Sequence, residues 1–523
     1  AGANNPAGAG LLNRQFLDAR TSRPLQLGAA TNNANVRIGG EGNQGYYDTV
    51  LVAALRTEQA FAHARYELTD DVTAFVQGSY SYSRNRYNAL YDNRAGTTAL
   101  RIFSGNPFIP SDIQSQMTAT GTASFSLSRM FTDFPVYATD TRTTSWTVTA
   151  GLEGKFNFFD NGRWDLYYTH GDARLRTSQN QVENRNLFAA LDAVTDPISG
   201  NPVCRVTLTN PGLLPGCVAL NPFGSRTPSA AAIDFVNNPS EFWVNNRLDE
   251  IGGNFGGSPF STWAGPVSFN VGFTYREQSL LETSNGNPAI PVDYTGIRGV
   301  PAIAPAKFSF TNVGVANGKL NSKEAYGELV VPVLRDFAIA KDVELNGALR
   351  FTDYSTSGSV WTWKAGLSWE IVDGIRIRAT RSKDIRAPTL YDLFAGRQVN
   401  PSFYNDEGVT GLTEPSVLIS GGNLSLKPEV GRTTAVGVVF QPSFLPGFSM
   451  SVDYYDLKIT NAISTIPPPH GAAGLRGERR HGSALQPDHP SPPDHRHVAI
   501  ELPDRVSQLP GKHRIVENQR YRH

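Results

Sequence analysis

The chain has 523 residues, and its 47 basic side chains balance its 47 acidic ones, so the formal net charge at neutral pH is zero. Nucleic-acid-binding proteins usually show a basic footprint, and this composition argues against that class. The mean hydropathy is -0.30, and no run of about 18 apolar residues occurs, so a transmembrane helix is not expected. Strands that cross a membrane escape this test, because their alternating polar and apolar residues average out.

The first 50 residues are rich in Gly, Asn and Ala and predict an irregular loop. Residues 40–45 fit the pattern G-x-G-x-x-G, but a dinucleotide site needs a buried strand before it. The preceding residues 32–37 are mostly polar, so we interpret the pattern as part of the loop. The N-terminal AGANNPAGAG lacks the basic and apolar regions of a signal peptide, and we therefore expect an N-terminally truncated fragment.

Apolar and polar residues then alternate with a period of two, which predicts strands with one apolar and one polar face. The first hairpin turns at residues 69–71, and Phe75 is the exception on its polar face. A second hairpin covers residues 146–168, with its turn expected at Asn161-Gly162, a strong tight-turn signal. Further alternating stretches lie at residues 267–275, 343–351, 361–369, 375–380 and 448–455.

The connections between these strands fall into two size classes. Outer-membrane barrels have short turns on one side and long loops on the other, whereas a soluble sandwich rarely tolerates several long structureless connections. Together with Trp and Tyr at strand ends, this asymmetry predicts an all-β transmembrane antiparallel barrel that contacts outer-membrane lipid. Short turns are expected near residues 69–71, 160–162, 257–265, 335–342, 373–374 and 445–447, and long loops near residues 84–143, 176–241, 280–321 and 382–432.

The second long loop has internal order. Residues 184–194 show helical spacing, and Cys204 and Cys217 lie close together after them. In an exported protein, two cysteines this close predict a disulfide. Unpaired thiols or a metal pair are the alternatives, and no histidine lies between the two cysteines to support a metal.

Arginines mark the polar face of the strand that begins at residue 375. Arg376, Arg378 and Arg381 lie at or near that face, where they could line a path for an anionic substrate or meet a plug. Ordinary electrostatics of a watery lumen is the simpler interpretation. We find no GxSxG, HExxH, CxxC or phosphate-loop motif, so the sequence predicts no catalytic residues, no cofactor, no metal site and no enzyme.

Three elements follow one another towards the end of the strand region. Ile385-Arg386-Ala387-Pro388 is the first, GNLSLKPE at residues 422–429 the second, and DYYDLKITNAI at residues 453–463 the third. In this order they resemble the C-terminal barrel of TonB-dependent outer-membrane receptors, where the first two read FRAP and NPxLKPE. Leu424-Ser425 departs from that pattern. The residues that carry the resemblance are Arg386, Ala387, Pro388, Asn423, Leu426, Lys427, Pro428 and Glu429.

The resemblance covers roughly residues 55–465. It implies a 22-stranded barrel closed by an N-terminal plug, in the outer membrane of a Gram-negative bacterium. It also implies active uptake of a scarce substrate (siderophore-, cobalamin- or oligosaccharide-like), driven by the inner-membrane TonB complex. Neither a plug nor a TonB box is visible, so we expect residues 1–466 to be a barrel fragment of such a receptor. A passive outer-membrane porin and a secreted, soluble β-rich binding protein are the alternatives.

The composition changes abruptly after Ile466. Residues 467–523 hold seven of the nine histidines, no Phe and no Trp, and their many prolines exclude central strands. We expect this segment to be a disordered, non-native tail produced by a reading-frame shift near codon 466.

Overall fold

The computed structural model describes residues 14–17, 21–30, 37–40, 48–95, 98–301, 305–406, 412–464 and 514–517. The glycine-rich pattern at residues 40–45 lies almost wholly outside these ranges. Of residues 467–523 only β25 (Arg514–Glu517) is described, and it pairs in parallel with β22 (Leu412–Ser420). The nature of the tail therefore stays a prediction.

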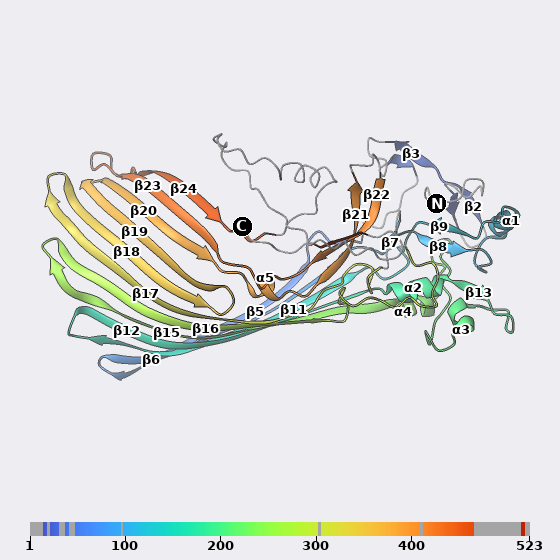
Figure 1. Cartoon of the computed structure of the whole chain (residues 1–523), viewed down its shortest axis with the longest axis horizontal. Coiled ribbons are helices and arrows are strands. Elements are labelled where there is room, and N and C mark those ends of the chain that lie inside the picture. The colour runs from blue at the N-terminus through green and yellow to red at the C-terminus, as the bar shows by residue number, and fades with distance from the viewer. Residues whose placement is uncertain are drawn as a thin grey trace, which may run out of the picture.

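A curved sheet of twelve strands dominates the molecule (Figure 1). Each strand pairs antiparallel with the next sheet strand along the chain, so the sheet is an up-and-down meander, and the predicted all-β antiparallel fold is confirmed. Within the described residues, the first and last of these strands form the sheet's two edges. The strands are β5 (Ala54–Thr69), β6 (Val72–Asn88), β11 (Ala138–Phe156), β12 (Asp160–Val182), β15 (Asn237–Thr262), β16 (Gly265–Ser284), β17 (Ala316–Phe337), β18 (Ala340–Tyr354), β19 (Gly358–Val372), β20 (Ile375–Arg386), β23 (Glu429–Phe440) and β24 (Met450–Thr460).

The two faces of this sheet differ in polarity. We call the face that residues 387–391 cover the inner face and the opposite one the outer face. On β16, Val271, Phe273 and Tyr275 are exposed on the outer face, while the residues between them face inward. Phe75 lies on the inner face, where its ring covers Gly151 so closely that a Cβ there would meet it at 2.7 Å.

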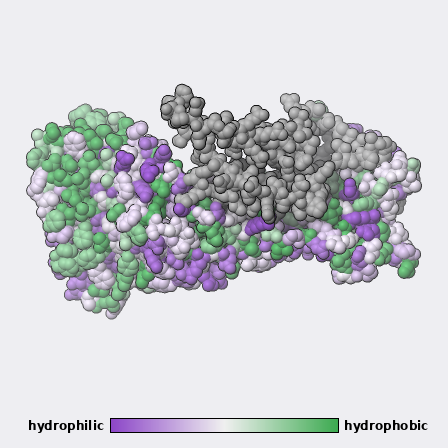
Figure 2. Space-filling view, in the orientation of Figure 1, coloured by the Kyte–Doolittle hydropathy of each residue, from purple (hydrophilic) through white to green (hydrophobic). Residues whose placement is uncertain are grey.

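The apolar residues of the outer face form a band that runs diagonally across the strand ladders. Tyr80 pairs with Trp146 in this band, but the same ladder continues through Asp172 and Arg247 to Lys319. Each strand therefore enters the band at a different point, as the strand tilt of a barrel requires. Hydrophobic residues gather at the end of the sheet that carries the short turns, and hydrophilic ones towards its middle (Figure 2).

The turns at that end include one correction. Asp373-Gly374 joins β19 to β20, and Gly374 has the positive φ of 81° that its turn needs. In the second hairpin, however, Phe156 pairs with Gly162, so Asn161-Gly162 closes a five-residue loop instead of forming a two-residue turn. The reason is aromatic packing, because Phe156 and Phe158 stack on each other and on Phe255 of the next strand.

The long connections are shorter than predicted and contain their own elements. Residues 89–137, 183–236, 285–315 and 387–428 connect strands that continue well past the apolar band. Beyond the band neither face is predominantly apolar, so the alternation disappears although the ladder goes on. The helices are α1 (Ser111–Ala119), α2 (Asn184–Leu191), α3 (Arg205–Thr209), α4 (Ala230–Val236) and α5 (Leu390–Phe394); the strands are β7 (Asn93–Arg94), β8 (Leu100–Phe103), β9 (Ser124–Leu127), β10 (Arg129–Met130), β13 (Ala193–Thr195), β14 (Pro202–Cys204) and β21 (Gln398–Asp406).

Two further points correct or complete the sequence prediction. The first 50 residues are not wholly irregular, because two small hairpins occur there: β1 (Arg14–Phe16) with β2 (Ser22–Pro24), and β3 (Leu27–Ala30) with β4 (Arg37–Gly40). None of the helices in the described ranges is long and apolar enough to cross a membrane.

Within the described residues, most of the buried core lies in the long connections and not in the sheet. One hydrophobic cluster joins the first connection to the second, and its members include Leu100, Met117, Phe131, Leu187 and Phe223, all fully buried. These two loops therefore fold together as a small domain at one end of the strands, which includes α2, α3 and α4 (Figure 1).

Candidate functional site

The inner face holds a cavity of about 540 Å³. It lies over the upper parts of β15 to β18, and the segment 387–391 at the start of α5 forms one side. This segment includes Ala387 and Pro388 of the first sequence element. Apolar lining comes from Val244, Leu280 and Leu320, and polar lining from Asn246, Arg276, Gln278, Ser322, Glu324 and Tyr354.

Ion pairs neutralise the charges around this cavity. Arg276 Nε donates to Glu250 Oε2 at 2.5 Å, and Arg350 Nη1 donates to Glu324 Oε2 at 3.0 Å. Tyr167 also donates its hydroxyl to Glu250, at 3.0 Å. The carboxylates are largely buried, with 13% and 10% of their side chains exposed, so their arginines offset the cost of taking them out of water. The wall thus offers hydrogen-bonding groups with little net charge.

Glu429 joins the three sequence elements into one junction. Its Oε1 accepts a hydrogen bond from Arg386 Nη2 at 2.8 Å and one from the backbone N–H of Ile463 at 2.6 Å. Arg386 Nη1 also lies 3.6 Å from Asp392 Oδ2, and Asp392 forms a capping box with Thr389 at the start of α5. The junction therefore fixes where α5 enters the space enclosed by the sheet.

The second element packs beneath this junction. Asn423 accepts from the backbone N–H of Ser425 at 2.8 Å, which tightens the turn, and the Asn423 backbone N–H bonds Asp392 O at 2.9 Å. Leu426 and Pro428 are buried, whereas Lys427 is exposed. These residues thus serve the local fold of the segment that covers the cavity.

Two of the long connections meet at Asp192, and a third contacts Arg298, one of its partners. Its carboxylate accepts from Arg205 Nε at 2.7 Å and from Arg298 Nε at 2.8 Å, and only 4% of the Asp192 side chain is exposed. The Arg298 guanidinium lies 4.1 Å from the ring centre of Phe103. We call residues 89–137, 183–236 and 285–315 the loop platform, because these contacts tie all three together.

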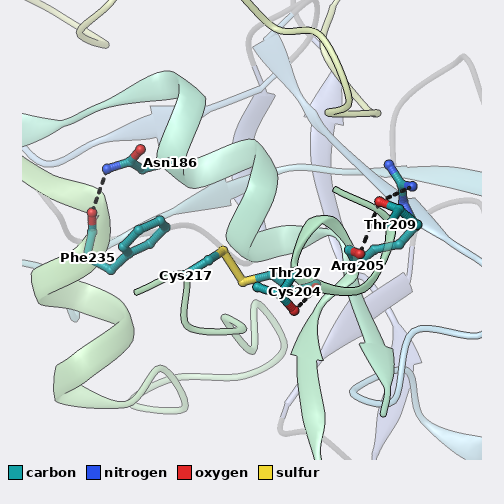
Figure 3. Close-up of a disulfide and its surroundings, with 7 residues drawn as sticks. All are labelled: Asn186, Cys204, Arg205, Thr207, Thr209, Cys217 and Phe235. Carbon is teal, nitrogen blue, oxygen red and sulfur yellow. Dashed lines mark hydrogen bonds between the residues drawn. A yellow bond between two sulfur atoms is a disulfide. The ribbon is translucent and has the colours of Figure 1, made fainter. Parts of the chain in front are cut away.

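The cysteine pair lies inside the loop platform (Figure 3). Cys204 and Cys217 are joined by a disulfide with an S–S distance of 2.07 Å. Cys204 is fully buried and packs with Ala189 and Val206, while Ile297 of the third connection covers the cluster. The disulfide therefore closes the segment that carries Arg205.

The loop platform is also fastened to the inner face of the sheet. Gln181 is fully buried, and its Oε1 accepts the backbone N–H groups of Phe310 and Thr311, each at 2.9 Å. Tyr137 donates its hydroxyl to Asp92 at 2.9 Å, and burial raises the pKa of that phenol. The third connection is thus held against the wall near its rim.

The three predicted lumen arginines do not share one face. Arg378 makes a bidentate pair with Asp453 at 2.9 and 2.7 Å, and Arg376 bonds Glu370 at 2.6 Å, both on the inner face. Arg381 lies on the opposite, outer face. The ladders on both sides of β20 are regular at that point, so residues with odd numbers face outward and those with even numbers, such as Arg376 and Arg378, face inward. Its placement with the other two is therefore wrong.

Sequence reasoning missed the cavity and its ion pairs. Glu250, Arg276, Glu324 and Arg350 all occupy polar positions of alternating strands, which was the available signal. Their convergence depends on register, and the sequence alone does not give it. Within the described residues, no group of three or more His, Cys, Asp or Glu could hold a metal ion.

Comparison with known proteins identifies a family with this architecture. Residues 116–486 match the family model described as "TonB dependent receptor-like, beta-barrel", which is more than half of the chain and extends past residue 466. Among solved structures the chain is similar to a ferric enterobactin receptor mutant (PfeA) from Pseudomonas aeruginosa in complex with enterobactin. That alignment has 14% identity and a TM-score of 0.44, and covers 90% of this chain and 48% of that one.

Two other receptors give similar values. The siderophore receptor PirA from Acinetobacter baumannii matches with 14% identity and a TM-score of 0.42, over 79% of this chain and 44% of that chain. The alcaligin outer-membrane receptor FauA from Bordetella pertussis matches with 13% identity and a TM-score of 0.37, over 79% and 45%. The chain thus spans somewhat less than half the length of these structures.

Proposed function

The chain belongs to the TonB-dependent receptor-like β-barrel family, and from this we propose that it forms the wall of an outer-membrane receptor for active uptake. The substrate is a scarce molecule of siderophore, cobalamin or oligosaccharide type. The inner-membrane TonB complex drives uptake through a plug and TonB box that act with the barrel. The location is the outer membrane of a Gram-negative bacterium, and the role is transport and not catalysis.

One observation carries the proposal most directly: the sheet is apolar outside and polar inside, with a cavity on the polar side. Val271, Phe273 and Tyr275 are exposed on the outer face, a pattern that a soluble protein would have to cover. The cavity lining presents to a substrate the hydrogen-bonding groups of Asn246 and Gln278, together with charged side chains that are already paired.

Uptake measurements in a strain that lacks the gene test this function. Cells that carry the full-length gene are supplied with labelled ferric siderophores, cobalamin or oligosaccharides, with and without a protonophore. Receptor function predicts saturable uptake of at least one substrate that stops when the proton-motive force collapses. Uptake that persists without energy and depends only on solute size would instead identify a passive porin.

A matched pair of variants connects the activity to the cavity. Gln278→Trp places an indole into the cavity lining and is expected to reduce uptake strongly. Ser279→Trp places the same ring on the outer face of the same strand and is expected to leave uptake unchanged. Equal effects of both variants would show that the cavity is not on the substrate path.

A further inference from the structure

Four arginines face one another across four neighbouring strands. Arg56 pairs with Arg84, Arg84 with Arg142, and Arg142 with Arg176, all on the outer face. We call these four residues the arginine row. Like charges directly opposite each other destabilise a sheet, so this row calls for a compensating anion.

Neighbouring carboxylates compensate only part of this charge. Asp140 lies within 4 Å of Arg84, Arg86 and Arg142. Asp172 serves both Arg174 and Arg247. Arg56 pairs with Glu58, and Arg176 pairs with Glu241. In total, seven guanidinium groups share four carboxylates, so this surface keeps an excess of positive charge.

A groove lies beside the arginine row on the same outer face. Its volume is about 260 Å³ and its lining is mostly apolar, with Trp243 of β15 and Leu281 of β16 on one side and Arg142, Arg174 and Arg176 of β11 and β12 on the other. The Arg176 guanidinium lies 5.9 Å from the Trp243 ring centre. The groove therefore has an apolar side and a cationic side.

The position of the row relative to the apolar band identifies the kind of partner. Arg142 lies four residues beyond Trp146 on β11, which is roughly 13 Å along the strand. With a strand tilt of about 45°, Arg142 lies about 9 Å above the edge of the band on β11. This depth is that of lipid headgroups. The long connections are at this end of the strands, and in barrels long loops face the outside.

We propose that the arginine row binds the phosphate groups of an anionic glycolipid in the outer leaflet, and that the adjoining groove takes part of its apolar portion. Guanidinium groups suit this role because they bind phosphate through paired hydrogen bonds. A lipid fits better than a protein because Arg142 lies only four residues beyond Trp146 of the apolar band, on the same outer face. The proposal rests on the proposed function in one respect, that the outer face meets lipid.

Binding of a defined lipid to variants tests the proposal. The full-length protein is extracted from outer membranes in non-ionic detergent and titrated with lipid A, a diphosphorylated glycolipid, with bound lipid counted by native mass spectrometry. Arg142→Gln/Arg176→Gln is expected to weaken binding about thirty-fold. Arg142→Lys/Arg176→Lys keeps the charge but not the paired hydrogen bonds, and is expected to retain part of the affinity.

A matched control removes the same charge elsewhere. Arg335 and Lys341 lie at the short-turn end, where they pair with Asp342 and Asp373. The Arg335→Gln/Lys341→Gln variant is expected to bind lipid A as the wild type does. Monophosphoryl lipid A should bind more weakly, and phosphatidylcholine should not bind detectably.

Several outcomes would overturn the inference. These are equal affinity of the wild type and the Arg142→Gln/Arg176→Gln variant, equal binding of phosphatidylcholine, or complete displacement of lipid A by millimolar inorganic phosphate, which would indicate a simple anion site. Heat-modifiable gel mobility establishes that each variant is folded. If the protein appears in the soluble fraction instead of the membrane, the proposed function itself fails, so the two failures are distinguishable.

Discussion

Val271→Arg is the substitution that probes the lipid-facing wall most directly. Val271 lies at the middle of the outer-face run from Val267 to Tyr275 on β16, and its side chain is 45% exposed there. This run has nine residues, which matches the length a tilted strand needs to cross the hydrocarbon. We therefore expect Val271 to lie near the bilayer midplane.

The neighbouring Asn270 is the matched control. It faces inward and lies directly opposite Glu328 of β17. An arginine at the midplane on the lipid side costs about 2–4 kcal/mol of folding free energy. The same residue at position 270 meets a carboxylate across the ladder, where opposite charges contribute roughly 0.2–1 kcal/mol of stabilisation. We expect the two variants to differ by at least about 2 kcal/mol.

Refolding of the full-length protein into phospholipid vesicles at graded urea concentrations measures this difference. Tryptophan fluorescence and the heat-modifiable shift on gels report the folded fraction. Equal free energies of unfolding for the two variants, or a larger loss for Asn270→Arg, would refute the assignment of the outer face to lipid.

Four further predictions follow from the loops and the tail. Replacing Cys204 and Cys217 by serine should destabilise the loop platform locally by about 3 kcal/mol and leave the barrel intact, as hydrogen exchange can measure. If reagent labels both thiols of the wild type without reductant, that prediction fails. Phe223→Ala removes a fully buried ring and should cost about 3–5 kcal/mol, lowering the thermal transition of the platform. Glu429→Gln should cost about 1.5 kcal/mol, because the hydrogen bond from Arg386 loses its charge assistance; unchanged protease sensitivity of residues 387–428 would argue against the junction. Translating the other frames of the DNA from codon 466 should give alternating segments that end in an aromatic residue, and their absence would remove the frame-shift explanation.

The sequence predicted the membrane-level part of the sheet well because burial there repeats with the strand period. Lipid on one side and water on the other impose the alternation seen around Val271 and around Trp146. Beyond the band this constraint disappears. The polar stretch that ends at Val182 was therefore predicted as loop, although it pairs with β15 up to Asn237.

The site depended on contacts that no local pattern records. Glu250 and Arg276 come from different strands, and their meeting is set by register. Arg381 was predicted on the inner face because it lies close to Arg378 in the sequence, but it is three residues away and so points to the opposite face. The signature residues could be identified, but that Glu429 bonds both Arg386 and Ile463 needed the three-dimensional arrangement.

The meeting of two connections at Asp192 also limits how this surface can diverge over evolutionary time. A change at Asp192 leaves two arginines from different loops without their shared partner, so positions 192, 205 and 298 should change together among relatives. Insertions and deletions are tolerated between such fixed points but not across them. Length variation should therefore concentrate in exposed stretches such as residues 196–201, at the surface, where a loop can grow without moving its anchors.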